Sequence, residues 1–335
     1  MRKTVLFHTN YLSLRGTEVA LYDYAHYNET LLGNRSVIVT RRSGVHEPPA
    51  LEKFHSRFPV VQYDVIGDLE TIASEWDGSL FYAIKSGEND GVLVKNCRSA
   101  VHAVFKAYEP HGDVYAYVSH WLAQAVGHPE VPFVPHMISL PPNDDDLRQE
   151  LGIPLQARVF GCYGGPDSFD IEFVQDILLS VAQAEPEIYF IFMNIDNFLP
   201  DASLRQISWW RRSKPMAFPN IIFLKGTADV HRKVAFINTC DAMLHARSRG
   251  ETFGIACGEF SSKNKPVITC DSTSVCERSH IEILGERGLY YHDKGSLRRL
   301  LFGNWDSGSR KWDAYTKEFS PQPVMEKFSS VFLQN

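Results

Sequence analysis

Short apolar runs alternate along the chain with longer segments in which apolar residues recur about every three or four positions. The short runs are typical of buried strands, and the longer segments are typical of amphipathic helices. The expected strands are 4–9, 34–40, 60–64, 80–84, 99–105, 115–119, 159–163, 188–193, 221–224, 241–246 and 267–269. The expected helices are 19–32, 68–75, 171–184, 230–238, 253–265, 296–302, 311–319 and 324–333. Strands that alternate with helices predict an α/β fold with parallel sheets.

The pattern falls into two halves. A chain of 335 residues is too long for a single hydrophobic core. Residues 139–146 read SLPPNDDD, and prolines followed by an acidic run are typical of a linker. A strand followed by a glycine turn opens the chain, and the same pattern returns at 159–165. We therefore expect two Rossmann-like domains, 1–140 and 141–312, followed by C-terminal helices within 313–335.

Composition and charge narrow the classes of partner. The chain is 44% hydrophobic and 22% charged, with a formal net charge of −6. This charge disfavours a broad surface for nucleic acid or for an anionic membrane, but it does not exclude a local basic patch, so a peripheral contact with a membrane stays open. No apolar run approaches the ~20 residues of a membrane-spanning helix, and the first strand is too short for a signal peptide. The six cysteines form no C-x-x-C pair, which predicts a protein of the reducing cytoplasm.

The stretch from Glu251 to Pro266 carries the strongest candidate chemistry. A strand at 241–246 leads through a polar turn into a helix, whose first N–H groups have no partner and can bind an anion. Gly254 lets a phosphate approach these amides because it has no Cβ. Glu251 and Glu259 flank the site, and their carboxylates can accept hydrogen bonds from vicinal hydroxyls. A phosphate between two polyols describes a nucleotide sugar.

The sequence Glu251-Thr-Phe-Gly-Ile-Ala-Cys-Gly-Glu259, followed by Asn264-Lys-Pro-Val-Ile268, resembles the Glu-x7-Glu motif of GT-B glycosyltransferases, family 4 most of all. The resemblance implies two Rossmann-like domains with parallel sheets facing a central cleft, with C-terminal helices that cross back to the first domain. It also implies sugar transfer with retention of configuration and without a metal ion. Glu251 would face the donor sugar, Glu259 the nucleotide ribose, and Gly254 with Ile255 the phosphate.

The resemblance extends to further donor-binding residues. Arg15-Gly16-Thr17-Glu18 stands where the family carries a Gly-Gly-Ala-Glu loop near the donor phosphates, which points to Gly16 and Thr17; a simple turn glycine is the alternative. In the second half the corresponding candidates are Gly164, Gly165, Thr252 and Phe253. His102, near the end of an expected strand, is our catalytic candidate on the first-domain side, where it would face the donor sugar; a histidine that packs in the core is the alternative. The donor would be a UDP- or GDP-sugar, and the acceptor a glycan, a lipid-linked molecule or a small molecule.

One feature departs from the family pattern. The loop 164–170 reads GGPDSFD and has no basic residue, whereas the family usually carries an Arg and a Lys there to neutralise the donor diphosphate. Arg247 follows the strand 241–246 directly and is our catalytic candidate for this charge; Arg249 is nearby and can equally be a solvated residue.

The missing cations also support an alternative, an inactive GT-B binding module. A nucleotide-sugar epimerase of the same fold is a further alternative. We expect no metal site, since the acidic run Asp144–Asp146 is typical of a solvated helix start.

Overall fold

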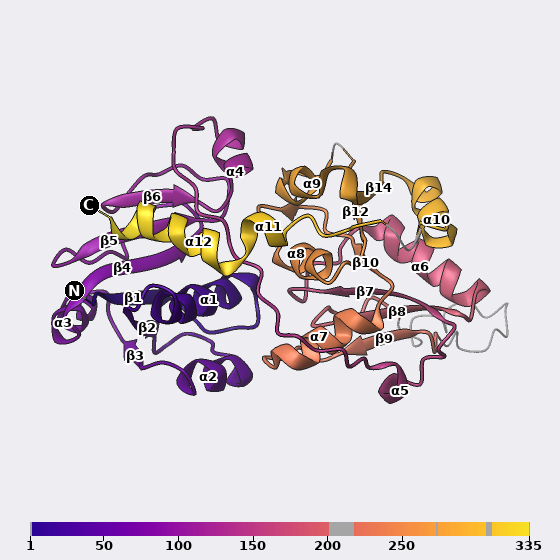
Figure 1. Cartoon of the computed structure of the whole chain (residues 1–335), viewed down its shortest axis with the longest axis horizontal. Coiled ribbons are helices and arrows are strands. Elements are labelled where there is room, and N and C mark those ends of the chain that lie inside the picture. The colour runs from indigo at the N-terminus through magenta and orange to yellow at the C-terminus, as the bar shows by residue number, and fades with distance from the viewer. Residues whose placement is uncertain (1, 201–217, 273, 306–309, 335) are drawn as a thin grey trace, which may run out of the picture.

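The computed structural model describes residues 2–200, 218–272, 274–305 and 310–334. Within these residues the chain forms two six-stranded sheets, each in its own domain, and Figure 1 shows the domains side by side. All strand pairs in both sheets are parallel. The predicted α/β fold with two parallel sheets is therefore confirmed.

The first sheet has the strand order β3-β2-β1-β4-β5-β6. Its strands are β1 Thr4–Thr9, β2 Arg35–Arg41, β3 Val60–Tyr63, β4 Gly78–Lys85, β5 Arg98–Ala103 and β6 Val114–Tyr117. Its helices are α1 Gly16–Thr30, α2 Pro48–His55, α3 Asp68–Glu75 and α4 His120–Ala125. The strand order reverses between β1 and β4, and such a reversal opens a crevice at the carboxyl ends of the strands.

Alternating side chains of the first sheet enter two separate cores. On β1, Val5 and Phe7 pack in the core beneath α1, whereas Leu6 packs in the core beneath α3. All six residues of β1 are buried for this reason. A strand covered by helices on both faces thus reads as a continuous apolar run, as the sequence shows.

The second sheet has the strand order β14-β12-β10-β7-β8-β9. Its strands are β7 Arg158–Tyr163, β8 Ile188–Met193, β9 Ile221–Leu224, β10 Ala242–His245, β12 Val267–Cys270 and β14 Gly288–Tyr291. The helices of this half are α5 Arg148–Leu151, α6 Glu172–Ala184, α7 Val230–Thr239, α8 Ile255–Ser262, α9 Ser279–Leu284 and α10 Lys294–Phe302. Beside the sheet, β11 Gly250–Glu251 pairs with β13 Glu277–Arg278. The order reverses between β7 and β10, which opens a corresponding crevice at the carboxyl ends of these strands.

The C-terminal segment returns to the first domain. It comprises α11 Thr316–Phe319, α12 Pro321–Phe328 and the π-helix Ser329–Leu333. Phe328 stacks on Tyr24 of α1, with ring centroids 5.2 Å apart, and both lie in one core cluster with β1. Figure 1 shows α12 in yellow lying against α1 and β4. Helix α11 begins only at Thr316, later than the predicted 311, because Asp313 accepts hydrogen bonds from the amides of Tyr315 and Thr316.

No helix in the described parts of the chain combines the length and the apolar character that a membrane crossing requires.

Candidate active site

Two adjoining cavities lie between the domains. The α7 cavity spans about 850 Å³ and the β11 cavity about 970 Å³, open solvent included. The α7 cavity is lined among others by Val19, Lys53, Asn194, Thr227, Lys233 and Glu259. The β11 cavity is lined among others by Arg15, Phe105, His136, Asp167, Arg247 and Glu251. Gly16, Tyr163, Gly164, Ile255 and Ala256 line both, so the cavities form one continuous cleft.

Helix α8 points its N-terminus into this cleft. Gly254 precedes the helix with φ 83° and ψ 65°, in the left-handed region that glycine tolerates. A Cβ at Gly254 would lie 3.0 Å from the Cβ of His280, so a side chain there would crowd the site. The first intrahelical hydrogen bond runs from the Gly258 amide to the Gly254 carbonyl at 2.9 Å. The amides of 255–257 precede that bond and are available to an anion.

Glu251 is held in its ionised form by two neighbours. Its Oε1 lies 3.3 Å from Nε2 of His245, and its Oε2 accepts a hydrogen bond of 2.9 Å from Nη1 of Arg247. Burial by itself would raise the pKa of Glu251, but the hydrogen bond from His245 and the charge of Arg247 outweigh it and lower the pKa to about 2. Arg247 lies in the cleft, and its guanidinium is engaged with Glu251. Arg249 pairs with Glu277 at 3.0 Å instead.

Behind Glu251, a chain of buried polar side chains continues into the second sheet. Nδ1 of His245 lies 2.8 Å from Oγ1 of Thr269, which in turn lies 3.1 Å from Nε2 of His280. Since the ionised Glu251 only accepts, Nε2 of His245 donates to it. Nδ1 of His245 can then accept from the Thr269 hydroxyl, and the oxygen of this hydroxyl can accept from Nε2 of His280. Burial lowers the pKa of His280 to about 3, so this imidazole is neutral.

Glu259 lies at the α7 side of the cleft. Its side chain is almost fully buried, and its carboxylate accepts hydrogen bonds from the hydroxyl of Tyr163 and from Nζ of Lys233. Lys233 comes from α7, so the pair joins the two helices that border this cavity. The sequence interpretation did not single out Lys233, because a lysine on the polar face of a helix carries no signal of its own.

The first-domain side of the cleft is the loop between β1 and α1. The buried carboxylate of Glu18 accepts hydrogen bonds from Ser13 Oγ at 2.6 Å and from Thr9 Oγ1 at 3.3 Å. Burial raises the pKa of Glu18 against the opposing effect of these bonds. They fix the loop so that Gly16 faces Ile255 of α8, where a Cβ on Gly16 would lie 3.6 Å from Cδ1 of Ile255. Thr17 lines the β11 cavity beside it.

The loop 164–170 borders the same cavity. Gly164, Gly165 and Asp167 line it. The carboxylate of Asp167 lies 3.3 Å from Nη2 of Arg15, a first-domain residue that the sequence interpretation did not select. Asp170, in contrast, is bound to Ser248, whose amide donates to Oδ1 at 2.7 Å. Among the residues that line this cavity, Phe253 and Thr252 complete the turn into α8.

The prediction that His102 faces the cleft is wrong. The side chain is fully buried in the first domain, with Nδ1 2.5 Å from the hydroxyl of Tyr82 and Nε2 2.8 Å from the carbonyl of Val134. Burial lowers its pKa to about 4. The reason is the period of two along β5: His102 faces the same side as Ala100, which packs in the core beneath α1.

His136 is the first-domain imidazole that reaches the cleft. It lies in the segment after β6, is 5% exposed, and lines the β11 cavity. Its Nδ1 has no hydrogen-bond partner among the described residues. Burial lowers its pKa well below the ordinary value, so the ring is neutral. The sequence interpretation missed it because it follows a proline in an irregular segment, away from any strand end.

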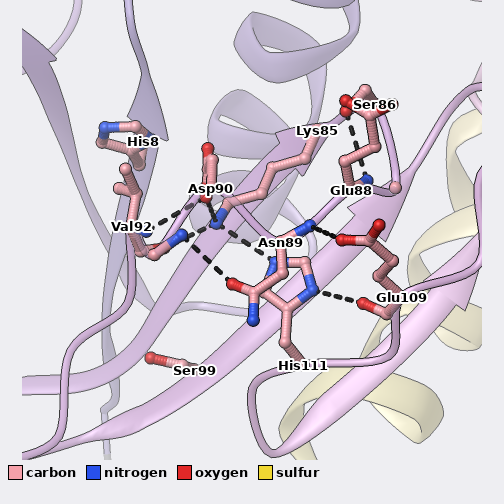
Figure 2. Close-up of polar contacts among 12 residues, drawn as sticks. His8, Lys85, Ser86, Glu88, Asn89, Asp90, Val92, Ser99, Glu109 and His111 are labelled. Carbon is pink, nitrogen blue, oxygen red and sulfur yellow. Dashed lines mark hydrogen bonds and ion pairs between the residues drawn. The ribbon is translucent and has the colours of Figure 1, made fainter.

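A second polar cluster lies at the end of β4, outside both cavities (Figure 2). Nζ of Lys85 donates to Oδ1 of Asp90 at 2.6 Å and to the carbonyl of Val92 at 2.6 Å, and it lies 3.4 Å from Nε2 of His111. Nδ1 of His111 is 2.6 Å from the carbonyl of Glu109, so it donates there and Nε2 is free to accept. All three donors of Lys85 are therefore used within the chain, and the cluster orders the segment after β4.

No group of three or more metal-ligating side chains comes together within the described ranges.

Comparison with known proteins identifies the fold. No sequence-family model matches the chain, and no curated protein matches its sequence. Among solved structures, Anabaena HepE in complex with UDP-glucose superposes with a TM-score of 0.70 at 15% identity, covering 98% of this chain and 99% of that one. A glycosyltransferase from Rickettsia africae gives 0.67 at 11% identity, with 100% and 99% covered. Sucrose-phosphate synthase from Thermosynechococcus elongatus gives 0.61 at 12% identity, with 99% and 95% covered. At these identities the likeness shows the fold, which is the GT-B architecture.

Proposed function

We propose that the chain is a glycosyltransferase of the family 4 type, which moves a sugar from a nucleotide-sugar donor to an acceptor with retention and without a metal ion. The observation that carries the proposal is the geometry at α8. The helix N-terminus opens into a cleft between two domains, with Glu251 on one side and Glu259 on the other. An anion site between two carboxylates suits a diphosphate that joins two polyols.

The donor would span both cavities. The α7 cavity, with Glu259 in its wall, would take the nucleoside, whose ribose hydroxyls donate to the carboxylate. The diphosphate would lie on the amides of 255–257, and the sugar in the β11 cavity near Glu251. Anabaena HepE, solved with UDP-glucose, supports beginning with UDP-sugars.

Glu251 can serve the sugar although both of its oxygens are already engaged. An ionised carboxylate has about four lone-pair directions, and His245 and Arg247 use two of them. The remaining directions can accept hydrogen bonds from sugar hydroxyls. Because the two neighbours keep Glu251 ionised and oriented, the sugar meets a fixed acceptor and no reorganisation is needed in the transition state.

In the proposed transfer, the bond between the anomeric carbon and the diphosphate oxygen breaks, and the electron pair stays with the diphosphate. The acceptor hydroxyl oxygen forms the new bond from the same face, and its proton passes to the departing phosphate oxygen. Negative charge grows on the diphosphate, and the amides at the N-terminus of α8 stabilise part of it.

The test is incubation with UDP-, GDP- and ADP-sugars in the presence and absence of EDTA, with a Glu251→Gln variant as control. We expect the protein to transfer the sugar of at least one donor, or to hydrolyse that donor slowly. NMR should show that the product keeps the anomeric configuration of the donor. EDTA should not change the activity, and the Glu251→Gln variant should lose it. Activity that needs manganese, or inversion of the anomeric centre, would contradict the mechanism.

Two other outcomes would identify the alternatives. A chain that shows no thermal shift with any nucleotide sugar would be an inactive GT-B binding module, which the absence of a basic residue from the loop 164–170 favours. Conversion of a nucleotide sugar to its epimer, without any acceptor, would identify an epimerase of the same fold.

A further inference from the structure

Arg15 lies over the loop that lacks a basic residue of its own. Its Nη2 is 3.3 Å from Oδ1 of Asp167, across the boundary between the domains. Nη1 of the same side chain would be 3.2 Å from a Cβ on Gly165, so the guanidinium rests on the glycine backbone of this loop. The charge missing from the loop 164–170 in sequence is thus present beside it in space.

The backbone around Arg15 fixes this position. Arg15 is the last residue before α1, and its amide donates to Oγ of Ser13 at 3.2 Å. Ser13 is bound in turn to the buried Glu18. The next residue, Gly16, faces Ile255 at the start of α8. Arg15 therefore lies where the first-domain loop, the loop 164–170 and the N-terminus of α8 meet.

The ion pair that now holds Arg15 is weak. The side chains of Arg15 and Asp167 are 46% and 75% exposed, and water and salt screen the attraction of such an exposed pair, so it adds little to stability. Arg247, the other arginine that lines the β11 cavity, is less exposed and is bound to Glu251. Arg15 is accordingly the cation that a ligand of this cavity can recruit at the lower cost.

We propose that Arg15 is the residue that neutralises the donor diphosphate, and that Asp167 holds Arg15 in place until the donor arrives. This inference rests on the proposed function. The planar guanidinium of Arg15 can donate two hydrogen bonds to phosphate oxygens. This interaction is stronger than the present contact with the exposed carboxylate of Asp167 at 3.3 Å. The cation would come from the first domain while the amides come from the second, so donor binding would also draw the domains together.

The effect of Asp167 on donor binding should depend on Arg15. Asp167 competes with the diphosphate for the guanidinium of Arg15, because both are negative. Removing the carboxylate charge should therefore tighten binding, and this gain should disappear when Arg15 is absent, since it acts through Arg15.

The experiment is calorimetric titration with UDP, repeated with GDP and ADP, of the wild type, Arg15→Gln, Asp167→Asn and the double variant. We expect Arg15→Gln to weaken binding about tenfold or more, as removal of a charge-assisted hydrogen bond does. Asp167→Asn should strengthen binding several-fold, and the double variant should bind like Arg15→Gln. Melting temperatures should stay close to the wild-type value, because the pair is exposed.

Arg42 and Asp64 provide the matched control. They form an exposed ion pair at 3.0 Å in the first domain, outside both cavities. Arg42→Gln and Asp64→Asn should leave UDP binding unchanged. Wild-type affinity in Arg15→Gln, or no gain in Asp167→Asn, would overturn the role of Arg15 while leaving the proposed function in place. A wild type that binds none of the three nucleotides would overturn both.

Discussion

His136 and Phe253 meet edge to face across the domain boundary, with ring centroids 5.6 Å apart and an interplanar angle of 79°. His136 comes from the first domain, and Phe253 from the turn that leads into α8. Both line the β11 cavity. The contact fixes a neutral imidazole beside the space that the donor sugar would occupy. The ring of His136 also packs against the rings of Tyr24 and His102, and its Nδ1 has no hydrogen-bond partner among the described residues.

We predict that His136 contacts the donor sugar. A neutral imidazole can donate one hydrogen bond and accept another, which suits a hydroxyl. His136→Ala should lower the rate of sugar transfer about tenfold or more, with little change in the affinity for bare UDP, because UDP lacks the sugar. Donor turnover and calorimetry measure the two effects. Turnover at the wild-type rate would contradict the assignment.

His102→Gln is the matched control and carries a prediction of its own. The glutamine amide can replace both hydrogen bonds of the buried ring, to Tyr82 and to Val134, without entering the cleft. Transfer should therefore continue at the wild-type rate. If the variant loses turnover while its melting temperature stays unchanged, His102 takes part in the reaction and the assignment to the core is wrong.

The pH dependence of folding should report the burial of His102. The folded pKa is lowered to about 4, below the unfolded value near 6.5, so the unfolded state binds more protons between these values. The stability that the neutral ring contributes is present above pH 6.5 and is lost as pH falls toward 4. Urea unfolding of wild type and His102→Gln should show a smaller loss in the variant over this window. If the free energy of unfolding falls equally with pH in the wild type and in His102→Gln, the lowered pKa does not belong to His102.

The part of the site formed by residues close in sequence could be predicted from the sequence. The contacts between residues distant in sequence could not. Glu251, Gly254 and Glu259 belong to one strand-turn-helix unit, so their spacing and turn chemistry already indicate an anion site. The contacts between Arg15 and Asp167 and between His136 and Phe253 join segments that are distant in sequence. Only the packing of the domains brings such pairs together.

The fold shows the same division. Periodicity predicts the strands because helices cover both faces of each sheet and make every position apolar. For the same reason periodicity does not tell which face a polar residue on a strand takes, and His102 was assigned to the wrong environment. The pattern also predicts no helix at Pro48–His55, where α2 lies, because two prolines open a segment of only eight residues.

The pair of Lys233 and Glu259 should matter for folding as well as for binding. Glu259 is 3% exposed, and removing its cation would leave a buried carboxylate with the Tyr163 hydroxyl as its remaining partner. Lys233→Met should lower the free energy of unfolding by a few kcal/mol, as loss of one member of a buried pair does. Glu259→Gln should weaken UDP binding by up to a few kcal/mol, because the carboxylate would accept from the ribose.

Urea unfolding and calorimetry measure these two effects, and Lys294→Met is the control. Lys294 pairs with Asp176 at 3.2 Å, but the two side chains are 59% and 66% exposed, so its loss should cost about 1 kcal/mol or less. Equal destabilisation by the two lysine variants would show that burial of the Lys233 pair is unimportant. If Glu259→Gln binds UDP as tightly as the wild type does, the ribose does not bind to this carboxylate.

Thr269 lines neither cavity, and we predict that it positions Glu251 through His245. Its hydroxyl lies 2.8 Å from Nδ1 of His245 and 3.1 Å from Nε2 of His280, so it fixes which nitrogen of His245 carries the proton donated to Glu251. Thr269→Val keeps the shape of the side chain and removes the hydroxyl. Turnover should fall about tenfold while the Kd for UDP stays unchanged, since Glu251 would face the sugar and not the nucleotide.

Thr269→Ser separates this positioning role from a general loss of packing. Thr269 is fully buried on β12, and the valine variant leaves the N–H of His280 without an acceptor, which costs about 1–3 kcal/mol of stability. Serine removes the methyl group but restores the hydroxyl, so it should recover the turnover even if some stability is lost to the smaller side chain. If valine and serine lower turnover equally, the effect comes from packing, and the hydroxyl does not orient His245 toward Glu251.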